Sequence, residues 1–336
     1  MSSFEPSHQF TDDAGEKKLI GSYVPGKVLG TVELSGGLKE ISVFHDVFLR
    51  YAFHDSSEYT LSIFREFVNI YINAARSMIG EENISIRDIP ERYHLNAQWQ
   101  HLTWEEDKQT DRYNDLRADA GDNSTYIEFQ NSLRSVKQKD RPDLTIEDRT
   151  LSYFALGINS NTYQKTTDLI WFFTKSKTDD KALASRGFTS FSLRRDHEPY
   201  DKLAVTSPST VLWVDLPALM QLDGHWDGIE SIRLARQLTK ILYGEEVEDK
   251  ENIILQIEEF LEMQFYSFQN EQGVLDVLTR NEIHDSEIRE QGREQGKEQE
   301  KITIAKKLLR RGLSREEICE ITELSQSEVL ILQREM

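Results

Sequence analysis

The chain has 336 residues, enough to bury one large core and a small appendage. Its apolar content of 38% and charged content of 29% are those of an ordinary globular protein, and no run approaches the roughly 18 apolar residues of a membrane span. The net charge of −19 argues against a simple DNA-coating protein, because a uniformly acidic surface repels duplex DNA. The single cysteine, Cys319, excludes an internal disulfide framework and a thiolate zinc site. With no signal-peptide pattern in residues 1–20, these features predict a cytoplasmic protein without membrane association.

The first third of the chain begins with a polar, glycine-rich stretch and continues with apolar residues at helical spacing. Residues 1–40 are predicted to form a poorly ordered or extended arm with at most short strands. A helical pattern begins at Ile41, and the run 59–79 places its large apolar side chains on one stripe, which predicts an amphipathic helix. Residues 83–103 indicate a strand or a loop.

The second half alternates strand-like and helix-like patterns. The predicted strands are rich in β-branched or aromatic residues and are bounded by polar residues, glycine or proline. Helices are predicted at 149–159, 229–243 and 252–268, and strands at 168–174, 188–193 and 210–215. This order of elements predicts an α/β sheet domain over residues 41–270.

Residues 271–302 are predicted to form a polar linker helix. The sequence EQGREQGKEQEK at 290–301 repeats every four residues and stacks Gly292 and Gly296 on one helical face. One interpretation is a solvated helix held by Glu–Arg and Glu–Lys pairs, and the other is close helix pairing through the glycines. The segment Lys297–Arg315 holds seven basic and two acidic residues, which fits either a solvated helix face or a nucleic-acid contact.

Residues 303–336 are predicted to form a small helical unit that resembles a helix-turn-helix. The expected recognition helix offers only Arg334 as a cation, and Glu323 stands where the turn usually has glycine. A docking or self-association module is therefore favoured over a DNA reader, and a homo-oligomer formed through the C-terminal helices is a predicted partner state. Gly312 is expected to end the first helix, and capping boxes to begin the next two: Ser314 with Glu317 and Ser325 with Glu328.

Residues 112–130 (RYNDLRADAGDNSTYIEFQ) predict a β-hairpin, because two alternating segments flank a run of turn-forming residues. A two-residue turn at Gly121–Asp122 pairs Asp115 with Glu128, with Cβ atoms about 4.5–5.5 Å apart. Gln130 then lies on the same face, one pleat along. The register decides this geometry, since a slip of one residue sends both carboxylates to a different pairing.

Two like charges placed opposite each other destabilise a sheet unless something compensates them. Two interpretations are open: an acidic hairpin that faces water, or a pair of ligands for a cation. Hard oxygen ligands at this spacing suit Mg²⁺ or Mn²⁺, which can stabilise charge on a phosphodiester oxygen. The histidines show no zinc-ligand spacing, and no nucleotide-binding or serine-hydrolase motif occurs in the chain.

The pattern D-x₁₂-E-x-Q formed by Asp115, Glu128 and Gln130 resembles the metal motif of the PD-(D/E)XK nuclease superfamily. It is most similar to that superfamily's family of transposases and recombination-promoting nucleases. The resemblance covers residues 45–336, because further segments match in the same order along the chain. They are HDVFLRYAFHDSSEYTLSIFREFVN (45–69), RTLSYFALG (149–157), DLIWFF (168–173), VLWVDLPAL (211–219) and the Gly/Glu repeat with its terminal helical unit.

This resemblance implies a restriction-endonuclease-like mixed sheet flanked by helices. It also implies that Asp115 and Glu128 bind Mg²⁺ or Mn²⁺, with the backbone carbonyl of Phe129 as a further ligand. Gln130 takes the place of the superfamily's lysine. An amide can orient a water or a phosphate, but it is neither a cation nor a base at pH 7.

Two accessory residues follow from the same resemblance. Asp46 either approaches the site from the first helix or serves only as an N-terminal helix acid, and Arg149 either clamps a phosphate or pairs with a neighbouring acid. The expected function is a Mg²⁺-dependent DNA endonuclease of the recombination-promoting or transposase-like type. The alternative is a nuclease-fold protein that no longer cuts and serves in DNA binding or oligomerisation, because Gln130 replaces lysine and the domain is acidic.

Overall fold

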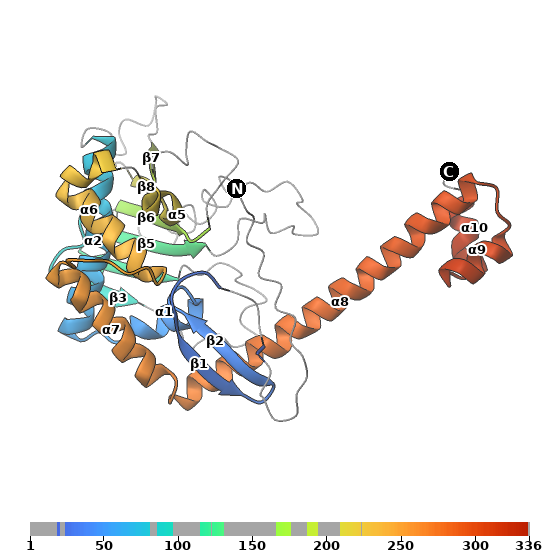
Figure 1. The fold of residues 1–336 in the computed structure, drawn as a ribbon, viewed down its shortest axis with the longest axis horizontal. Coiled ribbons are helices and arrows are strands. Elements are labelled where there is room, and N and C mark those ends of the chain that lie inside the picture. The colour runs from blue at the N-terminus through green and yellow to red at the C-terminus, as the bar shows by residue number, and fades with distance from the viewer. Residues whose placement is uncertain are drawn as a thin grey trace. The chain divides into compact units, whose positions relative to one another are not determined.

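The computed structural model divides the chain into two compact units, Met1–Val277 and Leu278–Met336, and each is described by itself. Within them the structure describes residues 19–20, 24–80, 86–96, 115–121, 123–130, 166–175, 187–193, 209–222 and 224–334 (Figure 1). The helix predicted at 149–159, and Arg149 with it, lies outside these residues. Across the described ranges, no helix combines the length and the apolar character needed to cross a lipid bilayer.

The first unit is built on a mixed sheet, which among the described residues has six strands in the order β3-β4-β5-β6-β8-β7. β5, β6 and β8 run parallel, whereas β3, β4 and β7 are antiparallel to their neighbours. The mixed α/β class is confirmed, and the three strands predicted in the second half are present within two residues at each end. The strands are β3 (His94–Asn96), β4 (Leu116–Ala120), β5 (Asn123–Gln130), β6 (Thr166–Phe173), β7 (Phe188–Leu193) and β8 (Ser209–Asp215).

The hairpin of β4 and β5 has the predicted register. Leu116 pairs with Ile127, and Ala120 pairs with Asn123 across the turn. Gly121 takes a φ of +55°, a conformation that glycine adopts without steric cost, while the other turn residue lies outside the described ranges. Continuing this pairing by one residue beyond the start of β4 places Asp115 opposite Glu128.

Helix α2 (Glu58–Ile79) packs against one face of the sheet. Its Tyr71 ring lies 5.0 Å from the ring of Phe172 on β6, and Phe172 stacks on Phe129 of β5 at 5.0 Å between centroids. Because side chains alternate along a strand, the residues on either side of Phe129 point to the opposite face. The aromatic packing therefore decides which face of β5 carries the candidate site.

The opposite face of the sheet carries a second apolar cluster. Because both faces of β6 are buried, its sequence is a nearly continuous apolar run rather than an alternating one. Trp171 pairs in register with Glu128, so this carboxylate borders the cluster. The members are Tyr126, Leu169, Trp171, Phe173, Val211 and Trp213.

The helices predicted at 229–243 and 252–268 are confirmed as α6 (Glu230–Leu242) and α7 (Asn252–Phe268). The helical pattern expected from residue 41 begins later, at α1 (Asp46–Ala52), because strand pairing continues through Ser42. After β8 the chain enters the short helix α5 (Leu216–Met220), capped by the carboxylate of the preceding aspartate, and then the 3-10 segment η2 (Gly224–Gly228).

Residues 24–40, within the predicted N-terminal arm, contain short strands that pack on the rest of the first unit. β1 (Val28–Leu34) and β2 (Gly37–Ser42) form an antiparallel hairpin, and the Lys27 N–H donates to the carbonyl of Leu242 in α6 at 2.7 Å. The hairpin also packs on α7, where Gly30 lies against a phenylalanine ring. Glycine serves close packing at this position, so a glycine-rich composition was a misleading sign of disorder.

The second unit corrects the boundary predicted between a linker helix and the terminal unit. α8 (Gln272–Arg310) is continuous through residues 302 and 303, so the linker and the first terminal helix are one element. Gly312 follows it with a φ of +80°, as expected of a residue that ends a helix. α9 (Arg315–Thr322) and α10 (Gln326–Arg334) complete the unit.

Both predicted capping boxes are confirmed. The Ser314 hydroxyl accepts a hydrogen bond from the Glu317 N–H, and the Glu317 carboxylate accepts one from the Ser314 N–H. Ser325 and Glu328 form the same pair of hydrogen bonds at the start of α10. Glu323 has a φ of +59°, which confirms the left-handed turn position. The three helices enclose a small core of Ala305, Ile318, Leu324, Val329 and Leu332.

Replacing Gly30 by alanine is expected to destabilise the protein by about 1–3 kcal/mol, because the added Cβ would lie 2.6 Å from the buried ring of Phe265. Gly36→Ala in the same hairpin is the matched control. Its added Cβ would lie 3.5 Å from Ile20, an ordinary contact, and the expected change is within about 0.5 kcal/mol. Denaturant titration measures both free energies of unfolding. Equal losses in the two variants would contradict the close packing of β1 on α7.

Candidate functional site

Asp115 and Glu128 lie together where the start of β4 meets the end of β5. The Glu128 carboxylate accepts a hydrogen bond from the Asp115 N–H at 3.1 Å, and the Asp115 carboxylate accepts one from the Phe129 N–H at 2.8 Å. Only 8% of Asp115 and 5% of Glu128 is exposed. The hairpin therefore buries two acids side by side, and the interpretation of an acidic hairpin that faces water is wrong.

Arg50 of α1 supplies a cation beside these acids. Its Nη2 donates to Asp115 Oδ1 at 2.9 Å, and 13% of the Arg50 side chain is exposed. Both carboxylate oxygens of Asp115 are thus bonded, one by the guanidinium and one by a backbone N–H. Arg50 was not among the predicted site residues. The available signal was its position four residues after Asp46, which places both side chains on one side of a helix.

The two charges of this ion pair are shifted in different ways. Burial raises the pKa of Asp115, and it outweighs the lowering by the Arg50 charge and by the Phe129 N–H. Burial also acts to lower the pKa of Arg50, but Asp115, Asp46 and Glu128 together raise it by more. The guanidinium therefore stays charged, while the carboxyl group beside it is harder to ionise than in water.

Asp46 lies in the first turn of α1, and about half of its side chain is exposed. Partial burial acts to raise its pKa, but the charges of His45 and Arg50 and the N–H of Val47 lower it by more. His45 Nδ1 lies 3.4 Å from the Asp46 carboxylate. Asp46 is thus a first-turn acid of α1 whose charge also acts on the Asp115–Arg50 pair.

Phe129 offers a further oxygen at this place. Its N–H points to Asp115, and since the N–H and carbonyl of one strand residue face the same neighbour, its carbonyl faces that side as well. Gln130 is 8% exposed and lies on the same face as Glu128, one pleat along. Hydrogen bonds thus join Asp115, Glu128 and Phe129, Gln130 lies on the face of Glu128, and Arg149 lies outside the described residues.

The donor set fits a hard divalent cation in its chemistry. Mg²⁺ is commonly bound by one or two carboxylates, with water completing its shell. The described part of the chain contains no cluster of three or more histidine, cysteine, aspartate or glutamate side chains arranged around one ion. Two carboxylates and a carbonyl could hold Mg²⁺ or Mn²⁺ here only if Asp115 released one of its two protein donors.

Asp168 is a buried carboxylate near the start of β6, and it has a different role. One oxygen accepts from the Thr210 N–H of β8 at 3.1 Å, and the other accepts from the Arg87 guanidinium at 3.2 Å. Burial raises the pKa of Asp168 to about 6, although the Arg87 charge and these bonds act to lower it. Asp168 therefore ties β6 to β8 and to the segment before β3, and it is a structural acid.

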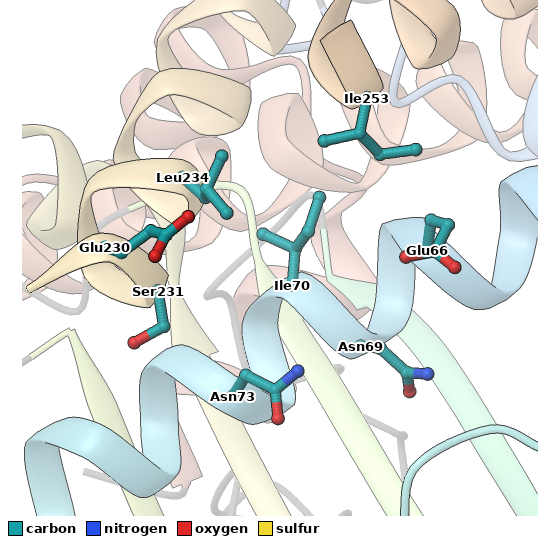
Figure 2. Close-up of a pocket in the computed structure, with 8 residues that line it drawn as sticks. All are labelled: Glu66, Asn69, Ile70, Asn73, Glu230, Ser231, Leu234 and Ile253. Atoms are coloured by element: carbon teal, nitrogen blue, oxygen red, sulfur yellow. The ribbon is translucent and has the colours of Figure 1, made fainter. Parts of the chain in front are cut away.

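The pocket in Figure 2 lies among α2, α6 and α7 and contains none of the hairpin acids. Two of its polar side chains bond neighbouring segments. The Asn69 amide exchanges hydrogen bonds with the backbone of Ile89, and the Ser231 hydroxyl bonds that of Ser77 at 2.7 Å. The pocket of about 450 Å³ is lined by Glu66, Asn69, Ile70, Asn73, Glu230, Ser231, Leu234 and Ile253.

Comparisons of the chain with protein-family models, with curated protein sequences and with solved structures gave no match. The resemblance to PD-(D/E)XK nucleases accordingly rests on the hairpin motif and on the order of the other segments along the chain. Nuclease activity, the metal ion and DNA as a substrate are proposals that rest on this resemblance and on the geometry of the site.

Asp168→Asn is expected to remove a pH dependence of stability. Because the folded pKa of about 6 exceeds 3.8, the folded state keeps a proton that the unfolded state releases, and the stability from this proton is lost as the pH rises from about 4 to about 6. The free energy of unfolding of the wild type, relative to the variant, should fall by about 2 kcal/mol between about pH 4 and pH 7. Urea titrations across this range measure the difference. A difference that does not change with pH would contradict the raised pKa.

Proposed function

We propose that the chain is a divalent-metal-dependent hydrolase of phosphodiester bonds in DNA, of the recombination-promoting nuclease type. One observation carries the proposal: Asp115 and Glu128 are buried side by side at adjoining strand ends, in the register that the motif predicts. Neighbouring buried acids destabilise a fold unless cations compensate them. Their hard oxygens, together with the Phe129 carbonyl, suit Mg²⁺ or Mn²⁺.

Each residue has a separate task in this proposal. Asp115 and Glu128 hold the ion, and the Phe129 carbonyl is a further ligand. The bound ion supplies positive charge that stabilises negative charge on a phosphodiester oxygen. The Gln130 amide orients the attacking water or the scissile phosphate, because it can donate and accept hydrogen bonds but cannot act as a base at pH 7. The water oxygen bonds phosphorus as the P–O bond to the departing sugar oxygen breaks. A non-bridging phosphate oxygen takes the water's proton, since the two acids are engaged as ligands, and the sugar oxygen leaves as a hydroxyl with that proton.

The charge distribution of the second unit supports DNA as the substrate. The segment Lys297–Arg315 contains seven basic residues and only two acidic ones. Of the basic residues, Lys307, Arg310 and Arg311 are exposed near the end of α8. Exposed cations of this kind bind the phosphate backbone without reading its sequence. The same cations also stabilise the C-terminus of α8 through the helix dipole, and the two roles are compatible.

A second candidate function is supported by Arg50. It and a backbone N–H bond both oxygens of Asp115, and Gln130 stands where the superfamily has lysine. A buried ion pair of this kind can be purely structural. The chain would then be a nuclease-fold protein that binds DNA or oligomerises and does not cut.

Asp115→Asn and Glu128→Gln are each expected to lower metal-dependent cleavage by at least about a hundredfold. Losing a residue that hydrogen-bonds to a metal ligand lowers metal affinity or activity by about 10- to 100-fold, and losing the ligand itself lowers it further. Nicking of supercoiled plasmid DNA, assayed with Mg²⁺, Mn²⁺ or a chelator, measures the effect.

Asp119→Asn is the matched control for this prediction. Asp119 is an acid on the same face of β4, but its carboxylate bonds Arg117 at 2.8 Å and the Ser124 hydroxyl rather than the site. This variant should keep the activity of the wild type. Nicking that persists in both Asp115→Asn and Glu128→Gln would refute the nuclease proposal. A calorimetric Mn²⁺ site that Glu128→Gln abolishes would count against the purely structural role of the pair.

A further inference from the structure

Arg50 and a divalent cation would compete for Asp115, because two positive charges held by one carboxylate repel each other. The guanidinium lies 2.9 Å from Oδ1, while Oδ2 accepts the Phe129 N–H at 2.8 Å. Phe129 is fixed inside β5 by its stack on Phe172, with 5.0 Å between the ring centroids, so its N–H cannot withdraw without breaking the sheet. The arginine side chain has several rotatable bonds. Of these two donors, only Arg50 can leave Asp115 while the fold stays intact.

We propose that Arg50 is a built-in competitor of the metal, which holds Asp115 in the metal-free protein and is displaced when a divalent cation binds. This inference rests on the proposed function, because it requires Asp115 to be a metal ligand. The free energy needed to break the Arg50–Asp115 pair is subtracted from the free energy of metal binding. Arg50 thereby sets the metal affinity of the site.

The backbone of Arg50 is held in place, so the exchange concerns its side chain alone. Helix α1 is anchored by Phe48, whose ring lies 6.2 and 5.4 Å from the rings of Phe265 and Phe268 in α7. The other side chains beside Arg50 on α1, Leu49 and Tyr51, are buried as well. The guanidinium is therefore presented at one fixed place, next to the carboxylate.

Asp46 provides a second partner for the displaced guanidinium. It lies one turn before Arg50 on α1, in the order of acid and base that favours pairing on a helix. Its side chain is about half exposed, and its charge already acts on that of Arg50. The exchange therefore moves the Arg50 guanidinium from the buried Asp115 to the more exposed Asp46. The guanidinium keeps an acid nearby throughout.

Calorimetric titration of Mn²⁺ into the full chain tests the competition without measuring cleavage. Arg50→Met is expected to lower the dissociation constant for Mn²⁺ at least about tenfold relative to the wild type, which corresponds to about 1.4 kcal/mol. Arg117→Gln is the matched control, because this guanidinium in the same hairpin pairs with Asp119 and lies over the Tyr126 ring. Its dissociation constant should stay within about twofold of the wild type. Arg50→Lys keeps the charge and should remain close to the wild type.

If Arg50→Met is too unstable for calorimetry without metal, the rise in Tm on adding Mn²⁺ provides a second measure of its affinity. Because a ligand stabilises the folded state according to its affinity, Mn²⁺ should raise the Tm of Arg50→Met by more than that of the wild type. The double variant Arg50→Met, Asp115→Asn removes both charges of the pair. It should fold without Mn²⁺ and show no rise in Tm when Mn²⁺ is added.

The possible outcomes separate this inference from the proposed function. Mn²⁺ binding by Arg50→Met that is no tighter than that of the wild type, with Asp115→Asn abolishing binding, would overturn the competition and leave the metal site standing. Absence of Mn²⁺ binding in the wild type, Arg117→Gln and Arg50→Met alike would refute the metal site and the proposed function together. Tighter binding confined to Arg50→Met supports the competition.

Discussion

The pairing register of β4 with β5 is the constraint on which the candidate site depends. Side chains alternate between the two faces of a strand, so a slip of one residue would exchange every side chain of β5 between them. Phe129 is held beneath α2 in a stack with Phe172, and exposing a ring of this size costs about 1.5–3 kcal/mol. Apolar packing thus fixes the register, and Glu128 meets Asp115 as a consequence. No attraction between the two acids is needed to bring them together.

Apolar packing around α7 places Arg50, the cation that compensates these acids. β1 approaches α7 closely because Gly30 has no side chain to collide with Phe265, and α7 in turn holds Phe48 of α1. Arg50 extends from this anchored helix to Asp115. The β1–β2 hairpin is therefore linked to the site through Phe265 of α7 and Phe48 of α1, and a change that loosens it should reach the Arg50–Asp115 pair as well.

Features decided by neighbours in sequence could be predicted, and features decided by distant contacts could not. The hairpin register and the capping box of Ser314 each depend on a few adjacent residues. Arg50 meets an acid 65 positions later in the chain, and no local pattern contains that pairing. Composition suggested an arm where Gly30 in fact permits packing on Phe265, and it suggested a boundary at residue 303 where α8 continues. The nuclease family, the metal ion and DNA as substrate stay predictions, because the fold class alone does not decide chemistry.

If this acidic chain acts on DNA, the residues that contact DNA and the residues that hydrolyse it must lie in different parts of the chain. Residues 1–285 carry a net charge of −18, whereas residues 286–336 carry −1 and contain the basic segment Lys297–Arg315. A phosphate that approaches Asp115 and Glu128 is repelled unless positive charge is added there, so the ion would be needed for binding at the site as much as for hydrolysis. The basic segment would contact DNA with an affinity that falls as salt is raised, independently of the ion. Under the proposed function, contact with DNA alone would leave the DNA uncut, and metal binding at Asp115 and Glu128 would be the step that permits cleavage.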